Sequence, residues 1–256
     1  MKKVGIIGLG SWGKNIYRNL DQFNVVELVY DNNLKNSNFD LIKKNKITRN
    51  VNEIFSSKTI DSIIIASPAI THKDYILKSL QNNKNVFVEK PLCLSLKDAI
   101  EIKKLSLEVN KIVFVGHLLQ YHNGFTELKN IIKSGKIGNL QIVKANRLNF
   151  GAIRQKESVL YDLASHDISM ILSITEVMPK KVEVNAIFNN SKKIADYINV
   201  LLYFENDLTA VINSDWISPY KEHRFSVLGS KGSLIFDDTK DWPNKLIINP
   251  SYLNKE

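Results

Sequence analysis

Cysteine and long apolar runs are scarce in this chain, and each scarcity excludes a class of protein. Cys93 is the only cysteine among 256 residues, so neither an internal disulfide nor a cysteine-based zinc site can form. No apolar stretch approaches the roughly 20 residues that span a bilayer. The apolar run after Met1-Lys2-Lys3 is cut by glycines and has no small-residue cleavage site, so we expect a strand there and no signal peptide. We therefore expect a cytoplasmic protein with no metal site and no membrane partner.

Arginine is scarce as well, and this bears on the net charge of +9. Five of the 35 basic residues are arginines, namely Arg18, Arg49, Arg147, Arg154 and Arg224. Nucleic-acid-binding proteins usually concentrate Lys and Arg in one stripe and often read base edges with Arg. Here the lysines are scattered along the chain, so we expect no nucleic-acid partner and only a mild attraction for anionic ligands.

The first half of the chain alternates short apolar runs with amphipathic stretches. We predict five buried strands, at 4–7, 25–29, 62–66, 85–88 and 112–115. Between them we predict helices that include 12–20, 72–81 and 96–109. Ser95 stands at the N-cap position of the last helix, three residues before Asp98. This alternation predicts a parallel sheet with helices on both faces, whose ligands bind beyond the carboxyl ends of the strands.

After about residue 116 the pattern changes to strand-like runs separated by turns. We predict helices at 124–133 and 160–174, and strands at 140–148, 182–188, 197–204, 208–213, 224–228 and 233–236. Residues 205–207 and 230–232 have the composition of hairpin turns. This half predicts a largely antiparallel sheet, so we expect two domains, at 1–117 and 118–256.

A glycine-rich turn follows the first predicted strand and opens the first predicted helix. It is a G-x-G-x-x-G pattern formed by Gly8, Gly10, Ser11, Trp12 and Gly13 around Leu9. In a dinucleotide-binding turn the first glycine permits the tight bend, the second lets a pyrophosphate approach, and the third lets helix and strand pack closely. The free N–H groups at the start of the helix then face the phosphates.

Asp31 ends the second predicted strand, 18 residues after Gly13. Its carboxylate can accept hydrogen bonds from the ribose hydroxyls of a dinucleotide and would repel a 2′-phosphate. No arginine follows it, so the sequence favours NAD over NADP. The alternative is a glycine-rich turn beside a surface aspartate, with no cofactor.

Glu89-Lys90-Pro91 follows the fourth predicted strand. Pro91 fixes its own φ and biases Lys90 toward an extended backbone. An ammonium group at the end of this strand can stabilise developing alkoxide character on a substrate oxygen. The alternative is a surface lysine, one of many in this chain.

Asp162 and His166 lie four residues apart in a predicted helix, so they share one face of it. An aspartate can orient an imidazole that acts as general base, a role worth about 10²–10⁴-fold in rate. The alternative is ordinary ion pairing on the surface of a helix.

Taken together and in order, these motifs resemble the glucose–fructose oxidoreductase, inositol dehydrogenase and rhizopine-catabolism (Gfo/Idh/MocA) family. The resemblance covers nearly the whole chain and implies an α/β fold, with an N-terminal Rossmann domain and a C-terminal α+β domain whose open sheet forms homo-oligomers. It also implies that Lys90, Asp162 and His166 are the catalytic residues. The same resemblance implies that a group of four residues belongs with the cofactor site: Ser67, Pro68, His72 and Glu89.

Within the family, the segment around Asp162 is similar to members of nucleotide-sugar and surface-polysaccharide pathways. By this resemblance Arg154 would meet a substrate phosphate or carboxylate, Tyr121 would line the sugar pocket, and Asp167 would lie beside them. A structural arginine and a packed tyrosine are the alternatives. We expect His122 to make local hydrogen bonds or packing contacts. The chain stops at Glu256, before the closing helix of many members, so we expect a truncated product or a compact variant.

These observations predict an NAD(H)-dependent oxidoreductase that moves a hydride to or from a hydroxyl-bearing carbon of a sugar-like substrate. Two alternatives remain. The first is an NAD-dependent glycosidase of the same fold, in which transient oxidation leads to net hydrolysis. The second is a regulatory protein that senses nucleotides without turnover, and the presence of the catalytic residues argues against it.

Overall fold

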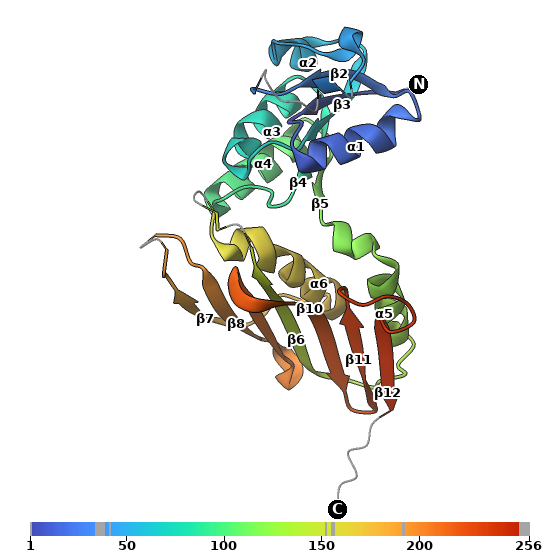
Figure 1. The fold of residues 1–256 in the computed structure, drawn as a ribbon, viewed down its shortest axis with the longest axis vertical. Helices are drawn as coiled ribbons and strands as arrows, with labels where there is room; N and C mark the ends of the chain where they lie inside the picture. Colours follow the sequence, from blue (N-terminus) through green and yellow to red (C-terminus); the bar gives the residue numbers. More distant parts are fainter. Residues whose placement is uncertain are drawn as a thin grey trace, which may run out of the picture. The chain divides into compact units, whose positions relative to one another are not determined.

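The computed structural model describes residues 2–33, 39–40, 42–151, 153–154, 157–190 and 193–250. The chain divides into two compact units, Met1–Gly116 (unit 1) and His117–Glu256 (unit 2) (Figure 1). Among the described residues, no helix has the length and apolar character needed to cross a membrane.

Unit 1 is built on a five-stranded sheet in the order β2-β1-β3-β4-β5. Its strands are β1 (Lys3–Ile7), β2 (Val26–Tyr30), β3 (Ile60–Ile65), β4 (Asn85–Glu89) and β5 (Val113–Gly116). Every neighbouring pair is parallel, as the alternation of strands and helices predicts. The carboxyl ends of these strands therefore meet at one edge of the sheet, where the glycine turn, Asp31 and Lys90 follow β1, β2 and β4.

Helices pack on both faces of this sheet. They are α1 (Ser11–Asp21), α2 (Asn52–Ser56), α3 (His72–Gln81) and α4 (Leu96–Glu108). Ile63 and Ile65 of β3 join an apolar cluster with α3 and α4, whereas Ile64 joins a second cluster with α1. Because successive strand residues point to opposite faces, these two clusters show that both faces are covered. Ser95 Oγ accepts a hydrogen bond from the Asp98 N–H, which confirms the predicted cap of α4.

Unit 2 is built on a seven-stranded sheet in the order β12-β11-β10-β6-β9-β8-β7. Its strands are β6 (Leu140–Phe150), β7 (Lys181–Ile187), β8 (Tyr197–Tyr203), β9 (Thr209–Asp215), β10 (Ile217–Gly229), β11 (Gly232–Asp237) and β12 (Leu246–Pro250). All neighbouring pairs are antiparallel except β6 and β9. The predicted largely antiparallel second sheet is therefore confirmed.

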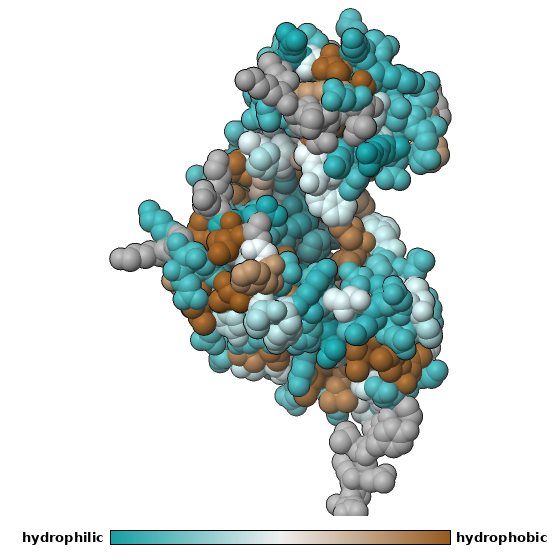
Figure 2. Space-filling model, viewed as in Figure 1, coloured by the Kyte–Doolittle hydropathy of each residue, from teal (hydrophilic) through white to brown (hydrophobic). Residues whose placement is uncertain are grey.

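Helices α5 (Asn123–Lys133) and α6 (Ser165–Thr175) pack against one face of this sheet (Figure 1). In β8, Ile198, Val200 and Leu202 are buried under them, and the residues between these three are half-buried. The second face is therefore only partly covered within the chain, and hydrophobic side chains, coloured brown, reach the surface of this unit in Figure 2. The predicted helix 160–174 begins as a π-helical turn, η5 (Leu160–Ala164), before it continues as α6.

Candidate cofactor and catalytic sites

The glycine turn after β1 packs so tightly that two of its glycines have no room for a side chain. Gly8 has φ +95°, and a Cβ there would lie 2.6 Å from the Ala66 carbonyl carbon and the Ser67 nitrogen. A Cβ at Gly13 would overlap the Gly8 carbonyl oxygen. Gly10 differs, because a Cβ there would meet nothing within 4 Å. The turn is thus closed at its two ends and open at its middle glycine.

Asp31 is buried against this turn. Its Oδ2 accepts a hydrogen bond from the Leu9 N–H at 2.6 Å, and its Oδ1 accepts one from the Asn33 N–H at 2.8 Å. Since each carboxylate oxygen has two acceptor sites, the side chain can still receive hydroxyl donors.

The start of α1 adds donors to the same place. Among the described residues no side chain caps this helix, whose N-cap residue is Gly10. Its first-turn N–H groups and the positive end of its dipole suit an anion. Ser11 and Trp12 are exposed there. An open glycine, free helix donors and a nearby carboxylate fit the pyrophosphate and ribose of a dinucleotide.

The turns after β3 and β4 are joined by one imidazole. His72 lies 2.8 Å through Nδ1 from the Pro91 carbonyl oxygen, and 2.8 Å through Nε2 from the Ser67 carbonyl oxygen. Burial lowers the pKa of this ring, and the two carbonyl contacts oppose that shift. Ser67 Oγ also lies 2.7 Å from Thr71 Oγ1, so the turn that carries the exposed Pro68 is bonded to the start of α3.

Lys90 leads into a cis peptide bond with Pro91. Its neighbour Glu89 is half-buried at the end of β4. Its carboxylate oxygens pack against Gly116 of β5, where an added Cβ would lie 3.4 Å from each of them. Burial raises the pKa of Glu89, and the backbone and charge of Lys90 oppose that rise. An ammonium group therefore follows a partly desolvated carboxyl group at the ligand-binding edge of the sheet.

In unit 2, Asp162 is buried within the π-helical turn. Its Oδ2 accepts hydrogen bonds from Trp216 Nε1 at 3.2 Å and from Arg154 Nε at 3.3 Å. His166 follows in the first turn of α6 and is half-buried. A π turn holds more residues than an α turn, so each residue turns through a smaller angle. Asp162 and His166 therefore do not share one face in the way that the predicted α-helix would place them.

Asp167 points into the interior, where it is 1% exposed. Its two carboxylate oxygens accept hydrogen bonds from Arg147 Nε and Nη2, each at 2.9 Å. Both oxygens are thus used by a buried, bidentate ion pair that fixes α6 to β6. His223 lies opposite Arg147 in β10, and burial, followed by the charges of Arg147 and Lys221, lowers its pKa to about 4.

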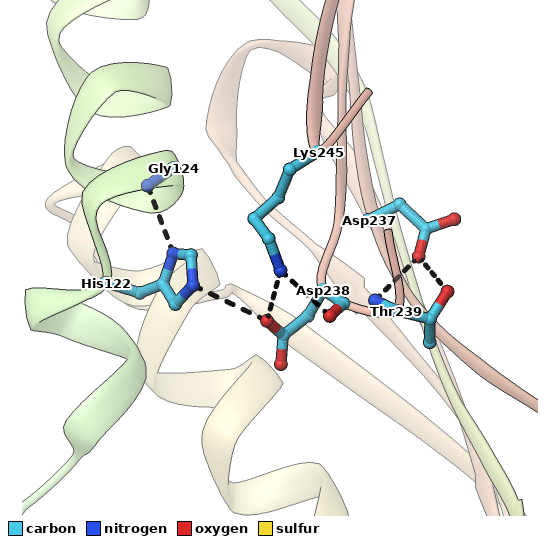
Figure 3. Close-up of polar contacts among 6 residues, drawn as sticks. All are labelled: His122, Gly124, Asp237, Asp238, Thr239 and Lys245. Atoms are coloured by element: carbon cyan, nitrogen blue, oxygen red, sulfur yellow. Dashed lines mark hydrogen bonds and ion pairs between the residues drawn. The ribbon is translucent and has the colours of Figure 1, made fainter. Parts of the chain in front are cut away.

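A separate polar cluster ties α5 to the end of β11 (Figure 3). His122 Nδ1 accepts a hydrogen bond from the Gly124 N–H, and its Nε2 lies 3.5 Å from Asp238 Oδ1. Lys245 Nζ approaches the same carboxylate at 3.2 Å and the Asp238 carbonyl oxygen at 3.0 Å. The predicted local hydrogen-bonding role of His122 is confirmed.

The remaining predicted site residues are accessible. Tyr121 ends the short helix η4 (Leu118–Tyr121) and is 67% exposed, and Arg154 has a side chain that is 52% exposed. Sequence analysis missed Trp216, and it assigned no partner to Asp167. Trp216 lies 54 residues from Asp162 in the chain, so no spacing pattern indicated their contact.

Both units are similar to known protein families. Residues 2–117 match the family model described as an oxidoreductase family with an NAD-binding Rossmann fold, and residues 125–235 match the Gfo/Idh/MocA C-terminal domain. The 2,7-anhydro-N-acetylneuraminate hydratase of Escherichia coli is 26% identical, over 93% of this chain and 68% of the relative. The myo-inositol 2-dehydrogenase of Thermotoga maritima is 23% identical, over 93% of this chain and 76% of the relative.

Solved structures share the fold across both units. GenD2 from gentamicin A biosynthesis, solved in complex with NAD, superposes with a TM-score of 0.85 over 99% of this chain and 82% of GenD2. At 18% identity this likeness shows the fold alone. The two family matches together span both units, and the chain belongs to the Gfo/Idh/MocA family of oxidoreductases with an NAD-binding Rossmann fold.

Proposed function

We propose that this protein transfers a hydride between NAD(H) and a hydroxyl-bearing carbon of a sugar, an inositol or a nucleotide sugar. One observation carries the proposal: a glycine turn open at Gly10, a carboxylate at Asp31 and an ammonium group at Lys90 all follow the carboxyl ends of strands in one parallel sheet. A relative that is a myo-inositol 2-dehydrogenase supports a polyhydroxylated substrate.

The cofactor of the proposal is NAD. Gly8, Gly10 and Gly13 would shape the pyrophosphate site, with N–H groups from Ser11 and Trp12. The Asp31 carboxylate already accepts two backbone hydrogen bonds and keeps acceptor sites for ribose hydroxyls. A 2′-phosphate placed beside this buried carboxylate would meet a like charge, so NADP would bind more weakly.

The proposed reaction gives a separate role to each of three side chains. His166 takes the hydroxyl proton, Lys90 donates a hydrogen bond to the oxygen as negative charge develops, and Asp162 orients His166. The bound nicotinamide supplies the hydride acceptor. Trp216 and Arg154 hold the Asp162 carboxylate in place.

The three predicted substrate residues have different roles in the proposal. Tyr121 and Arg154 are accessible, and the Arg154 Nε donates a hydrogen bond to Asp162. Its terminal nitrogens suit a phosphate or carboxylate on the substrate. Asp167 is 1% exposed and is paired with Arg147, so we propose that it positions α6 and does not touch the substrate.

The test is an initial-rate screen of NAD reduction against inositols, free sugars and UDP-sugars, with Lys90→Met and a control, Lys97→Met, at an exposed lysine of α4. We expect Lys90→Met to lower kcat by about 10²–10³-fold, because its ammonium stabilises charge in the transition state. The NADH dissociation constant should change less than about threefold. Full activity in Lys90→Met would refute the assigned role, and NAD binding without turnover of any substrate would favour a regulatory protein.

A redox-neutral reaction is the second candidate, because one relative is a hydratase. In this case the hydride would return to the same substrate molecule and no NADH would accumulate. Product analysis by mass spectrometry separates the two candidates. Net NADH with an oxidised sugar supports the dehydrogenase, whereas hydrated or cleaved sugar with unchanged NAD supports the alternative.

We also propose that a second copy of the chain covers the half-buried face of the sheet in unit 2. On this face Leu201 of β8 lies opposite Val211 of β9, and both apolar side chains are half-buried although they point away from α5 and α6. Light scattering coupled to size-exclusion chromatography should give at least a dimer, and a monomer at micromolar concentration would contradict the proposal.

A further inference from the structure

We propose that His72 is a positioning residue, which holds the backbone of the Lys90-Pro91 loop against the turn after β3. The inference rests on the role of Lys90 in the proposed function. It assigns to His72 a task that differs from cofactor contact, the role that sequence resemblance implies for it.

The first support is where the imidazole lies. His72 is the first residue of α3 and is 1% exposed, so a ligand cannot reach its ring without displacing the surrounding chain. Each ring nitrogen lies 2.8 Å from a carbonyl oxygen, that of Pro91 or that of Ser67. Since both nitrogens face backbone carbonyl oxygens inside the protein, neither is left for a cofactor.

The second support is what the ring connects. β3 and β4 are parallel neighbours, so the turns that follow them lie side by side at the ligand-binding edge. Gly8 packs against the backbone of Ala66 and Ser67, where even a Cβ would lie 2.6 Å away. A continuous series of contacts therefore runs from the glycine turn through Ser67 and His72 to Pro91, the residue next to Lys90.

The two contacts of the imidazole are not equivalent. A neutral ring has one N–H, so it donates to one carbonyl only. Burial lowers the pKa of His72, which favours the neutral ring. The bond from Nδ1 to the Pro91 carbonyl is the one that bears on Lys90, and we assign the proton to Nδ1.

Two substitutions separate the two bonds. In His72→Asn the amide nitrogen occupies about the place of Nδ1 and can still donate to Pro91. In His72→Gln the amide nitrogen extends to about the place of Nε2 and can donate only to Ser67. His72→Asn loses more packing volume than His72→Gln, so a larger loss of kcat in His72→Gln would not be a packing effect.

We expect kcat of His72→Asn to stay within about threefold of the parent protein. His72→Gln should lose about 10- to 100-fold, the range expected when a buried carbonyl loses its donor. The dissociation constant of ADP-ribose, which lacks the nicotinamide, should stay unchanged in both variants. Equal kcat values in the two variants would overturn the proposal, and so would loss of ADP-ribose binding in both, because His72 would then only support the fold.

A second measurement needs no turnover and so separates this inference from the proposed function. The fluorescence emission of bound NADH reports the surroundings of the nicotinamide. We expect it to change in His72→Gln and to match the parent protein in His72→Asn. If no polyol is oxidised but this difference is found, the proposed function fails while the positioning role of His72 stands. Identical NADH emission in both variants would overturn the role.

Discussion

The two units hold their functional groups in place by different means. In unit 1 the buried polar side chains Asp31 and His72 bond to backbone atoms, and the glycine turn is fixed by close backbone packing. In unit 2 Asp162 and Asp167 are held by other side chains, and Arg147 supplies a buried charge. We therefore expect the stability of unit 1 to depend on side-chain volume near its turns. The stability of unit 2 should depend on its buried charges.

The strongest way to sharpen this comparison is to remove the buried cation of unit 2. Arg147→Met keeps much of the apolar stem but leaves the Asp167 carboxylate buried without its bidentate partner. We expect the free energy of unfolding to fall by about 3–5 kcal/mol, measured by urea unfolding. The buried Trp216 provides a fluorescent probe within unit 2.

Two further variants complete that experiment. Lys104→Met removes an exposed ion pair with Glu108 and should cost less than about 0.5 kcal/mol. The double variant Arg147→Met/Asp167→Leu should regain much of the lost stability, since no unpaired charge remains. A loss in Arg147→Met no larger than in Lys104→Met would contradict the contrast between the units.

The next largest effect is expected from added volume in unit 1. Gly13→Ala places a methyl group against the Gly8 carbonyl oxygen, so we expect unfolding to be easier by about 2–3 kcal/mol and NADH affinity to fall by at least about tenfold. Gly10→Ala is the control. Its methyl group meets no protein atom within 4 Å, so stability should change by less than about 1 kcal/mol while NADH binding still weakens. Equal loss of stability in both would contradict the role assigned to close packing at Gly13.

The smallest effect at neutral pH is expected for His223, whose influence on stability appears only in acid. The folded-state pKa of His223 is lowered to about 4 by burial and by the charges of Arg147 and Lys221, against about 6.5 in an unfolded chain. Above pH 6.5 the ring is neutral in both states. As pH falls from about 6.5 to about 4, only the unfolded chain takes up the proton, so stability declines by up to ~1.4 kcal/mol per pH unit.

His223→Gln should flatten this acid limb when urea unfolding is repeated at several pH values. Some slope should remain, because the pKa of His72 in unit 1 is lowered in the same direction. An unchanged acid limb in the variant would show that His223 does not couple stability to pH.

The features that sequence predicted best are local along the chain. The glycine turn and the cap of α4 depend on residues within a few positions of one another, so the pattern of side chains carries the necessary information. The order of strands and helices was also predictable, because apolar periodicity reflects burial directly. Two of the α-helices and β-strands were missed: α2, with five residues, shows too few turns for a helical period, and β12 ends in a proline.

The features that sequence could not predict join distant parts of the chain. Trp216 reaches Asp162 across 54 residues, and Arg147 reaches Asp167 across 20. Each contact depends on how strands of unit 2 pack against α6, and neither follows from residue type alone. The π-helical turn belongs with them, because helix propensity does not distinguish a π turn from an α turn.

That π-helical turn fixes the rotational phase of the segment around it. One residue corresponds to about 100° of rotation in an α-helix. Deleting Leu163 would return the segment to α-helical geometry and turn everything before it by about that angle relative to α6. The carboxylate of Asp162 would then leave the indole of Trp216 while the buried Arg147–Asp167 pair kept α6 in place. The extra residue of the π-helical turn thus sets the direction of the Asp162 carboxylate without changing the position of α6, the helix that carries His166.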